Sequence, residues 1–155
     1  MAFPQIADLM SLDNPAFRAY IFYNSILILK MLCMAPLTAR LRMAKKIFLS
    51  PEDTKLLKGA KHGIEDPDIE RVRRAHRNDM ENILIYFVAS YCYLLTNPGT
   101  TLAIMLMRLF TIARVAHTFV YAVYVVPQPA RAIAFFVGYF VTGYMAITSM
   151  LYFIN

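Results

Sequence analysis

The sequence predicts an all-α membrane protein, a four-transmembrane-helix bundle that forms one integral membrane domain over the whole chain. Of the 155 residues, 59% are hydrophobic, and the mean hydropathy is +0.47, far more apolar than a soluble domain of this length. The apolar residues also form separate stretches of the length that a span needs, about 20 residues. The predicted spans cover residues 16–41, 71–95, 102–126 and 130–154, with a polar loop over 42–70.

The first predicted span follows a clear helix start. Asn14 is a capping residue, and Pro15 follows it at the first helical position. From Ala19 to Ala39 the single charge is Lys30, which at membrane depth needs a partner or a water-filled interior. The sequence does not identify that partner. The residues before Asn14 lack the basic segment and apolar core of a cleaved signal peptide, so we expect this span to act as an uncleaved signal anchor.

The polar loop lies in the most basic part of the chain. Eleven of the sixteen Lys and Arg residues lie between Arg40 and Arg77, and the net charge is +6. A basic block can bind nucleic acid, but beside membrane spans it more simply fixes orientation. We therefore expect this loop on the cytoplasmic side and no nucleic-acid partner. Within it, Ser50 to Asp53 has the form of a helix start with acids in the first turn.

The second predicted span begins inside a dense run of charge. At about 100° per residue, three guanidinium groups and one carboxylate fall within a sector of about 100°, formed by Arg73, Arg77, Glu81 and Arg74, with Asn78 at its edge. Guanidinium forks suit carboxylates, and Glu81 accepts an ammonium group or pairs with Arg77 at i, i+4. The sector fits a small zwitterion with several carboxylates. A solvated helix end with internal salt bridges is the alternative interpretation.

The third predicted span also carries a polar stripe. Four polar side chains recur at i, i+3, i+4 and i+7 on one helix face, namely Arg114, His117, Thr118 and Tyr121. A lone histidine on such a helix usually packs in the core with a hydrogen bond. The arginine and tyrosine on the same face favour a binding stripe.

The last span starts after the breaker Pro127-Gln128-Pro129, and residues 132–154 carry no charge. Arg131 stands in its first turn, where a cation opposes the helix dipole but suits an anion bound together with backbone N–H groups.

Cys33 and Cys92 lie in apolar segments at a spacing that suits no zinc site and no disulfide framework, so we expect no metal. A bundle this small has little interior of its own, which suggests an oligomer without fixing its size.

At this point the residues resemble a known family. Residues 70–81, ERVRRAHRNDME, resemble the signature of the membrane-associated proteins in eicosanoid and glutathione metabolism, the MAPEG family. Residues 51–53, PED, residues 114–118, RVAHT, and residues 127–132, PQPARA, support the resemblance, which covers nearly the whole chain. The last of these segments has the form found in the family's microsomal glutathione transferases.

The resemblance implies a homotrimer with a glutathione site at each subunit interface. Glutathione is then the co-substrate, and its thiolate attacks hydrophobic electrophiles or reduces lipid hydroperoxides. The positions that match the family's glutathione ligands are Arg42, Arg74, Arg77, Asn78, Glu81, His117, Tyr121 and Arg131. To these we add Arg73, His76 and Arg114, from the charged run and the polar stripe. Arg131 matches the arginine that stabilises the thiolate and is the predicted catalytic residue.

Three alternatives stay open: a glutathione-dependent isomerase like the family's prostaglandin E synthases, a non-enzymatic membrane lipid-binding protein, and a small channel. Ala132 stands where those synthases have serine, which argues against the isomerase. Thr54 stands where vertebrate transferases have a reactive cysteine, so we expect no activation by thiol reagents there. The implied location is the endoplasmic reticulum membrane, which the sequence does not separate from the mitochondrial outer membrane.

Overall fold

The structure is a computed structural model that describes residues 6–154. Four long helices dominate these residues, and short elements join them. In chain order the elements are α1 (Ile6–Leu9), α2 (Pro15–Lys45), β1 (Ile47–Phe48), η1 (Pro51–Leu56), β2 (Lys61–His62), α3 (Pro67–Leu95), α4 (Thr100–Thr118), η2 (Phe119–Val123) and α5 (Ala130–Phe153). Here η1 is a 3₁₀-helix, and η2 is a π-helical turn that continues α4.

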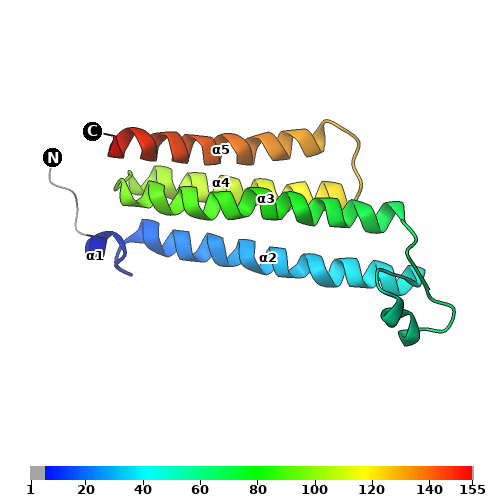
Figure 1. Cartoon of the computed structure of the whole chain (residues 1–155). Helices are drawn as coiled ribbons and strands as arrows, with labels where there is room; N and C mark the ends of the chain where they lie inside the picture. The colour runs from blue at the N-terminus through cyan, green and yellow to red at the C-terminus, as the bar shows by residue number, and fades with distance from the viewer. Residues whose placement is uncertain (1–5, 155) are drawn as a thin grey trace.

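The long helices run side by side in three layers (Figure 1). Helices α3 and α4 form the middle layer, α2 packs on one side of them and α5 on the other. The α2–α3 connection and the α4–α5 connection lie together at one end of the bundle, and the α3–α4 turn lies at the other. The basic α2–α3 connection and the first turn of α5, which carries Arg131, are thus at the same end of the bundle.

The predicted helix start at Asn14 and Pro15 is present in α2, whereas α3 starts four residues before its predicted span. Asn14 caps α2, because its side-chain oxygen accepts from the Ala16 N–H at 2.9 Å. The helix runs to Lys45, one turn beyond the predicted end at residue 41, and Lys46 ends it in the left-handed conformation, with φ of 56°. Helix α3 starts at Pro67, so the charged run lies wholly within a helix.

Within residues 6–154, three segments are long and apolar enough to cross a membrane: Pro15–Lys45, Thr100–Val123 and Ala130–Phe153. Helix α3 has the length, with 29 residues, but its first half carries the charged run. That α3 also spans the bilayer stays a prediction.

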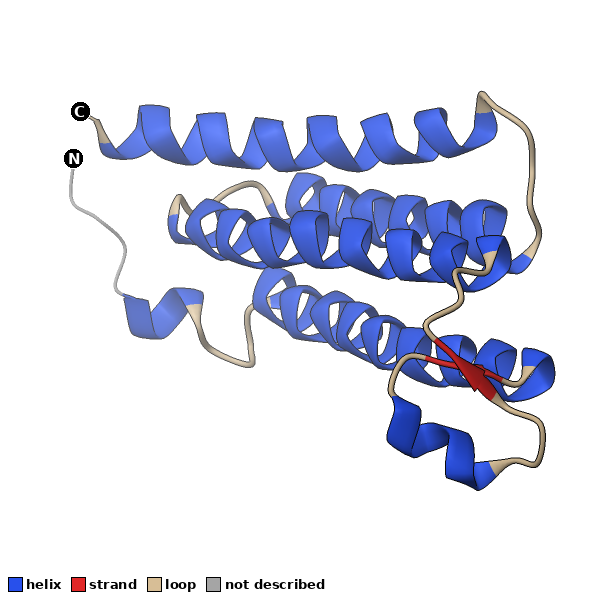
Figure 2. Cartoon of the chain, turned by 45° about the vertical axis from the view of Figure 1, so that its right-hand side comes forward, coloured by secondary structure: helices blue, strands red, loops and turns tan. Residues whose placement is uncertain are grey.

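The α2–α3 connection contains structure of its own (Figure 2). Strands β1 and β2 pair in parallel over two residues each. Between them η1 starts at Pro51, with Glu52 and Asp53 in its first turn, as predicted, although Ser50 makes no side-chain cap bond. The short helix α1 was not predicted.

A buried ion triad joins three of the four long helices. Asp79 of α3 accepts from Lys30 of α2 and, at 2.6 Å, from Arg114 Nη2 of α4. Thr118 Oγ1 donates to the same carboxylate at 3.2 Å. The Asp79 and Arg114 side chains are 0% and 1% exposed. Asp79 is therefore the partner that Lys30 requires, and we call Lys30, Asp79 and Arg114 the ion triad.

Gly138 lets α5 approach α4 beside this triad. A Cβ atom at this position would lie 3.5 Å from Arg114 Cδ and 3.5 Å from Phe110 Cε2. Small residues allow such close helix packing in membranes. We expect Gly138→Leu to lower the free energy of unfolding by about 1–3 kcal/mol, because a larger side chain overpacks this contact. Gly138→Ala is the control, since its single methyl fits at ordinary van der Waals distance. Equal unfolding free energies for the two variants, measured in mixed detergent, contradict this packing.

A second ion cluster closes the end of the bundle where α2 meets α3. Lys45 Nζ donates to Asp66 at 2.7 and 2.9 Å and also contacts Asp68. The hydrogen bond from Lys45 lowers the pKa of the Asp66 carboxyl below its ordinary value. Asp66 also caps α3, because its Oδ1 accepts from the Ile69 N–H at 3.1 Å.

This cluster gives a pH-dependent stability. Because the pKa of Asp66 is lower in the folded protein, its stabilisation is complete above the unfolded value of about 3.9 and is lost as the pH falls below it. We expect Asp66→Asn, which keeps a capping oxygen, to unfold more easily than the parent at pH 6, with the difference shrinking towards pH 3. Detergent unfolding at several pH values measures this. Asp8→Asn is the control, because Asp8 takes part in none of the ion pairs of residues 6–154.

Candidate functional site

A polar cavity of about 340 Å³ lies towards the end of the bundle that holds the α2–α3 and α4–α5 connections. Side chains from α3, from α4 with η2, and from α5 line it. They are Arg74, Arg77, Asn78, Glu81, His117, Tyr121, Arg131, Ala132, Phe135 and Phe136. Seven of the eleven glutathione-site residues predicted from sequence are therefore brought together here. We call this space the polar cavity.

Helix α3 supplies four lining residues from one face. They recur at i, i+3, i+4 and i+7 and are Arg74, Arg77, Asn78 and Glu81. At about 100° per residue, the centre of this lining face lies about 90° around the helix from Arg73. Arg73 is therefore at the edge of the face. Arg73 pairs with Glu70 instead and does not line the cavity.

Helix α4 supplies His117 and its continuation supplies Tyr121. The two rings meet edge to face, with centroids 5.6 Å apart. Tyr121 lies in the π-helical turn η2, a widened turn of a kind that often occurs at functional sites. His117 is 2% exposed, so the histidine is held by packing while its ring borders the cavity.

Helix α5 supplies Arg131 from its first turn. The Arg131 guanidinium lies over the Tyr121 ring, 4.4 Å from its centroid, a cation–π geometry that fixes the cation. The neighbouring Ala132 N–H donates to Gln128 Oε1 at 3.3 Å, so this backbone donor is already used within the chain.

The polar cavity carries an excess of positive charge. Its lining contains three arginines against the single carboxylate of Glu81. None of these four groups takes part in the ion pairs formed within residues 6–154, so the predicted pair of Glu81 with Arg77 is not made. Unpaired guanidinium groups bind carboxylates bidentately, and the lone carboxylate accepts an ammonium group. Residues 6–154 contain no cluster of His, Cys, Asp or Glu side chains suited to a metal ion.

Four predicted residues lie outside the polar cavity: Arg42, Arg73, His76 and Arg114. Arg114 is buried and bound to Asp79 and Asn78, so its place in the periodic stripe reflects packing against α3. Arg42 is in the last turn of α2.

Asp79 was not predicted from the sequence, although helical pitch could have identified it. It lies about 240° around the helix from Arg73, away from the charged sector and towards the core. Phe135 and Phe136 were also not predicted from the sequence as residues that line the polar cavity.

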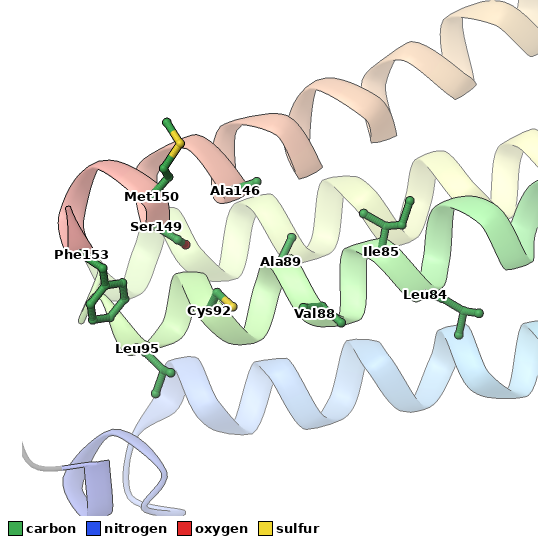
Figure 3. Close-up of a pocket in the computed structure, with 10 residues that line it drawn as sticks. All are labelled: Leu84, Ile85, Val88, Ala89, Cys92, Leu95, Ala146, Ser149, Met150 and Phe153. Atoms are coloured by element: carbon green, nitrogen blue, oxygen red, sulfur yellow. The ribbon is translucent and has the colours of Figure 1, made fainter.

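Two apolar cavities continue along the α3–α5 side of the bundle. One, of about 520 Å³, is lined by residues that include Asn82, Ile85 and Tyr139. The next, of about 750 Å³, shares Ile85 and reaches the far ends of both helices. Figure 3 shows its lining, almost all aliphatic, aromatic or sulfur side chains. The α3–α5 side thus changes from cationic at one end to apolar at the other, which suits amphipathic or apolar ligands.

Helices long and apolar enough to cross a membrane surround a cavity lined by three arginines, so this chain is a helical membrane protein. The sequence model of the MAPEG family matches residues 20–151, and the chain belongs to that family.

Proteins of two names are among those similar to this chain. The chain is 41% identical over 148 residues to microsomal glutathione S-transferase 1 of Bos taurus, covering 91% of this chain and 95% of that protein. The Homo sapiens protein of the same name is 40% identical over the same shares. Prostaglandin E synthase of Homo sapiens is 36% identical over 115 residues, which cover 74% of this chain and 76% of that protein.

Proposed function

We propose that this protein is a membrane-bound glutathione transferase that joins the glutathione thiolate to hydrophobic electrophiles and also reduces lipid hydroperoxides. The observation that carries the proposal is the polar cavity itself, with three arginines and one carboxylate that form no ion pair within residues 6–154. Glutathione is a zwitterion with two carboxylates and one ammonium group, the complement of that charge set. The transferase names of two relatives, each aligned over 148 residues, support the same activity.

The chemistry needs glutathione as its anion. A free thiol has a pKa of about 8.5, so only a small part is thiolate at neutral pH. Arg131, held over Tyr121 in the first turn of α5, places a positive charge and the positive end of a helix at the cavity wall. The thiolate then attacks the electrophilic carbon, a C–S bond forms, and the leaving group departs with its electron pair.

The electrophile reaches this site from the bilayer in our proposal. Phe135 and Phe136 form the apolar wall of the polar cavity, and the larger apolar cavities follow along α3 and α5. An apolar molecule dissolved in lipid therefore meets apolar surface next to the cationic site. Glutathione enters from the aqueous side, where the basic α2–α3 connection lies.

The proposal includes an assembly and a location. We propose that α3 spans the membrane with the three apolar helices, that three copies form a homotrimer, and that glutathione binds between subunits. Arg42, Arg73 and His76 lie outside the polar cavity of the single chain, and a subunit interface gives them access to the ligand. We place the protein in the endoplasmic reticulum membrane, with the mitochondrial outer membrane as a second site.

A glutathione-dependent isomerase is the second candidate, supported by the similarity to prostaglandin E synthase. Ala132 lies beside Arg131 in the cavity lining and offers no hydroxyl group to an endoperoxide. A product assay with a prostaglandin endoperoxide separates the candidates, because the transferase proposal predicts no glutathione-dependent isomer.

The proposed function is tested by assaying the detergent-purified protein with glutathione and 1-chloro-2,4-dinitrobenzene. We expect a saturable rate of conjugate formation, with chloride released, because the aromatic electrophile is apolar and the thiolate is its nucleophile. Heat-unfolded protein at the same concentration is the control. A rate no higher than this control, in protein that is folded and binds glutathione, argues for the isomerase. Failure to bind glutathione at all removes both candidates.

A further inference from the structure

The ion triad touches the polar cavity at one residue. Arg114 Nη2 donates to Asn78 Oδ1 at 2.8 Å and to Asp79 Oδ1 at 2.6 Å. Asn78 lines the polar cavity, whereas Arg114 and Asp79 do not. The triad is therefore connected to the ligand space through the Asn78 side chain.

This contact fixes which end of the Asn78 amide faces the ligand. A guanidinium group has only donors, so the atom that it binds must be the carbonyl oxygen of the amide. The Asn78 –NH2 group is the other end of the same planar group and stays available to the cavity. Asn78 can then donate a hydrogen bond to a ligand. A carboxylate, which only accepts hydrogen bonds, requires such a donor.

The rest of the triad holds Arg114 in place. A terminal nitrogen of a guanidinium group carries two hydrogens, and Arg114 Nη2 uses them on Asn78 and Asp79. Lys30 and Thr118 bind the other carboxylate oxygen of Asp79, which prevents that group from rotating. At 1% exposure Arg114 has no solvent to compete for these bonds, so the orientation is set by the fold.

We propose that Arg114, held by Asp79 and Lys30, is a positioning residue that turns the Asn78 amide so that its –NH2 group donates to a ligand carboxylate. The proposal rests on the proposed function, because it names glutathione as that ligand. It replaces the direct glutathione contact that the sequence suggested for Arg114 with an indirect role.

The first test concerns the polarity of residue 78. In Asn78→Ala the donor is missing, whereas in Asn78→Asp a carboxylate next to Arg114 turns its second oxygen towards the ligand and repels it. We expect glutathione to bind about tenfold more weakly to Asn78→Ala and more weakly still to Asn78→Asp. Isothermal titration of the detergent-purified proteins gives the two dissociation constants. Tighter binding by Asn78→Asp than by Asn78→Ala overturns the proposal, because the ligand then faces the oxygen end.

The second test asks whether Arg114 acts through Asn78. If it does, Arg114→Met weakens glutathione binding in the parent but adds nothing once Asn78 is alanine, so a double-mutant cycle is non-additive. KM for glutathione should rise with little change in kcat, because the reacting atoms are not touched. Additive effects overturn the proposal. The Asn78 comparison still decides the matter if Arg114→Met fails to fold.

Arg108→Met is the matched control for Arg114→Met. Arg108 also lies on α4 and also bonds to a neighbouring long helix, since its Nε donates to Tyr23 Oη of α2 at 2.8 Å, but it does not line the polar cavity. We expect its dissociation constant for glutathione to stay within about twofold of the parent. Parent protein that fails to bind glutathione defeats the proposed function. Parent protein that binds, with additive effects in the cycle, defeats only the positioning role.

Discussion

Arg131→Ala is expected to lower kcat/KM for glutathione conjugation about 100-fold while leaving the fold intact. A cation that lowers the pKa of the bound thiol by two units contributes about 2.7 kcal/mol, which is about 100-fold in rate. Arg131 is only partly buried, stands in the first turn of α5 and contacts the Tyr121 ring, so its removal leaves no buried charge unpaired. Initial rates with 1-chloro-2,4-dinitrobenzene over a range of glutathione concentrations measure the loss.

Arg108→Ala is the control for this substitution. It removes one arginine from the same bundle, at a position outside the polar cavity, and should keep its activity within about twofold. Unchanged turnover in Arg131→Ala removes Arg131 from the mechanism. Equal losses in both variants point instead to a general effect of net charge.

Asp79→Ala is expected to cost about 3–5 kcal/mol of unfolding free energy, because it leaves buried charges without their partner. Lys30 and Arg114 both bind the Asp79 carboxylate, and the Asp79 and Arg114 side chains are almost fully buried. The loss also removes the ionic links that join α3 to α2 and to α4. Unfolding in mixed detergent micelles, followed by helical circular dichroism, measures it.

The triple variant Lys30→Met, Asp79→Leu, Arg114→Met gives the matched comparison. Replacing a buried ion cluster by apolar side chains of similar size is often neutral for stability, so this variant should stay close to the parent. It should nevertheless bind glutathione more weakly, since Asn78 loses its fixed orientation. A stable Asp79→Ala variant contradicts the buried triad.

The helices and much of the site follow directly from the sequence. The helix start at Asn14 and Pro15 can be predicted without knowledge of the tertiary structure. The Asn14 side chain accepts a hydrogen bond from a backbone N–H in the first turn of the same helix. The face of α3 that lines the polar cavity also follows from helical pitch alone, since residues three and four apart share one side.

Contacts between helices do not follow from the sequence. The partner of Lys30 is 49 positions away, and periodicity within one helix carries no information about such pairs. The same limit explains why Arg114 was predicted to contact glutathione directly. A stripe of polar residues has the same spacing in the sequence whether it faces a ligand or a carboxylate on the next helix. The predicted sector included Arg73 and had Asn78 at its edge, whereas the cavity lining includes Asn78 and not Arg73. This shift has a related cause, since the centre of the lined face depends on where α4 and α5 pack.

Thiolate formation in the polar cavity can be measured by the ultraviolet absorbance of glutathione thiolate when glutathione is titrated into the detergent-purified protein at neutral pH. We expect a saturable thiolate band in the parent and a much smaller band in Arg131→Ala at ligand concentrations that fill both proteins. Bound glutathione without a thiolate band in the parent, or an equal band in both proteins, contradicts the claim that the polar cavity holds glutathione as its reactive anion through Arg131.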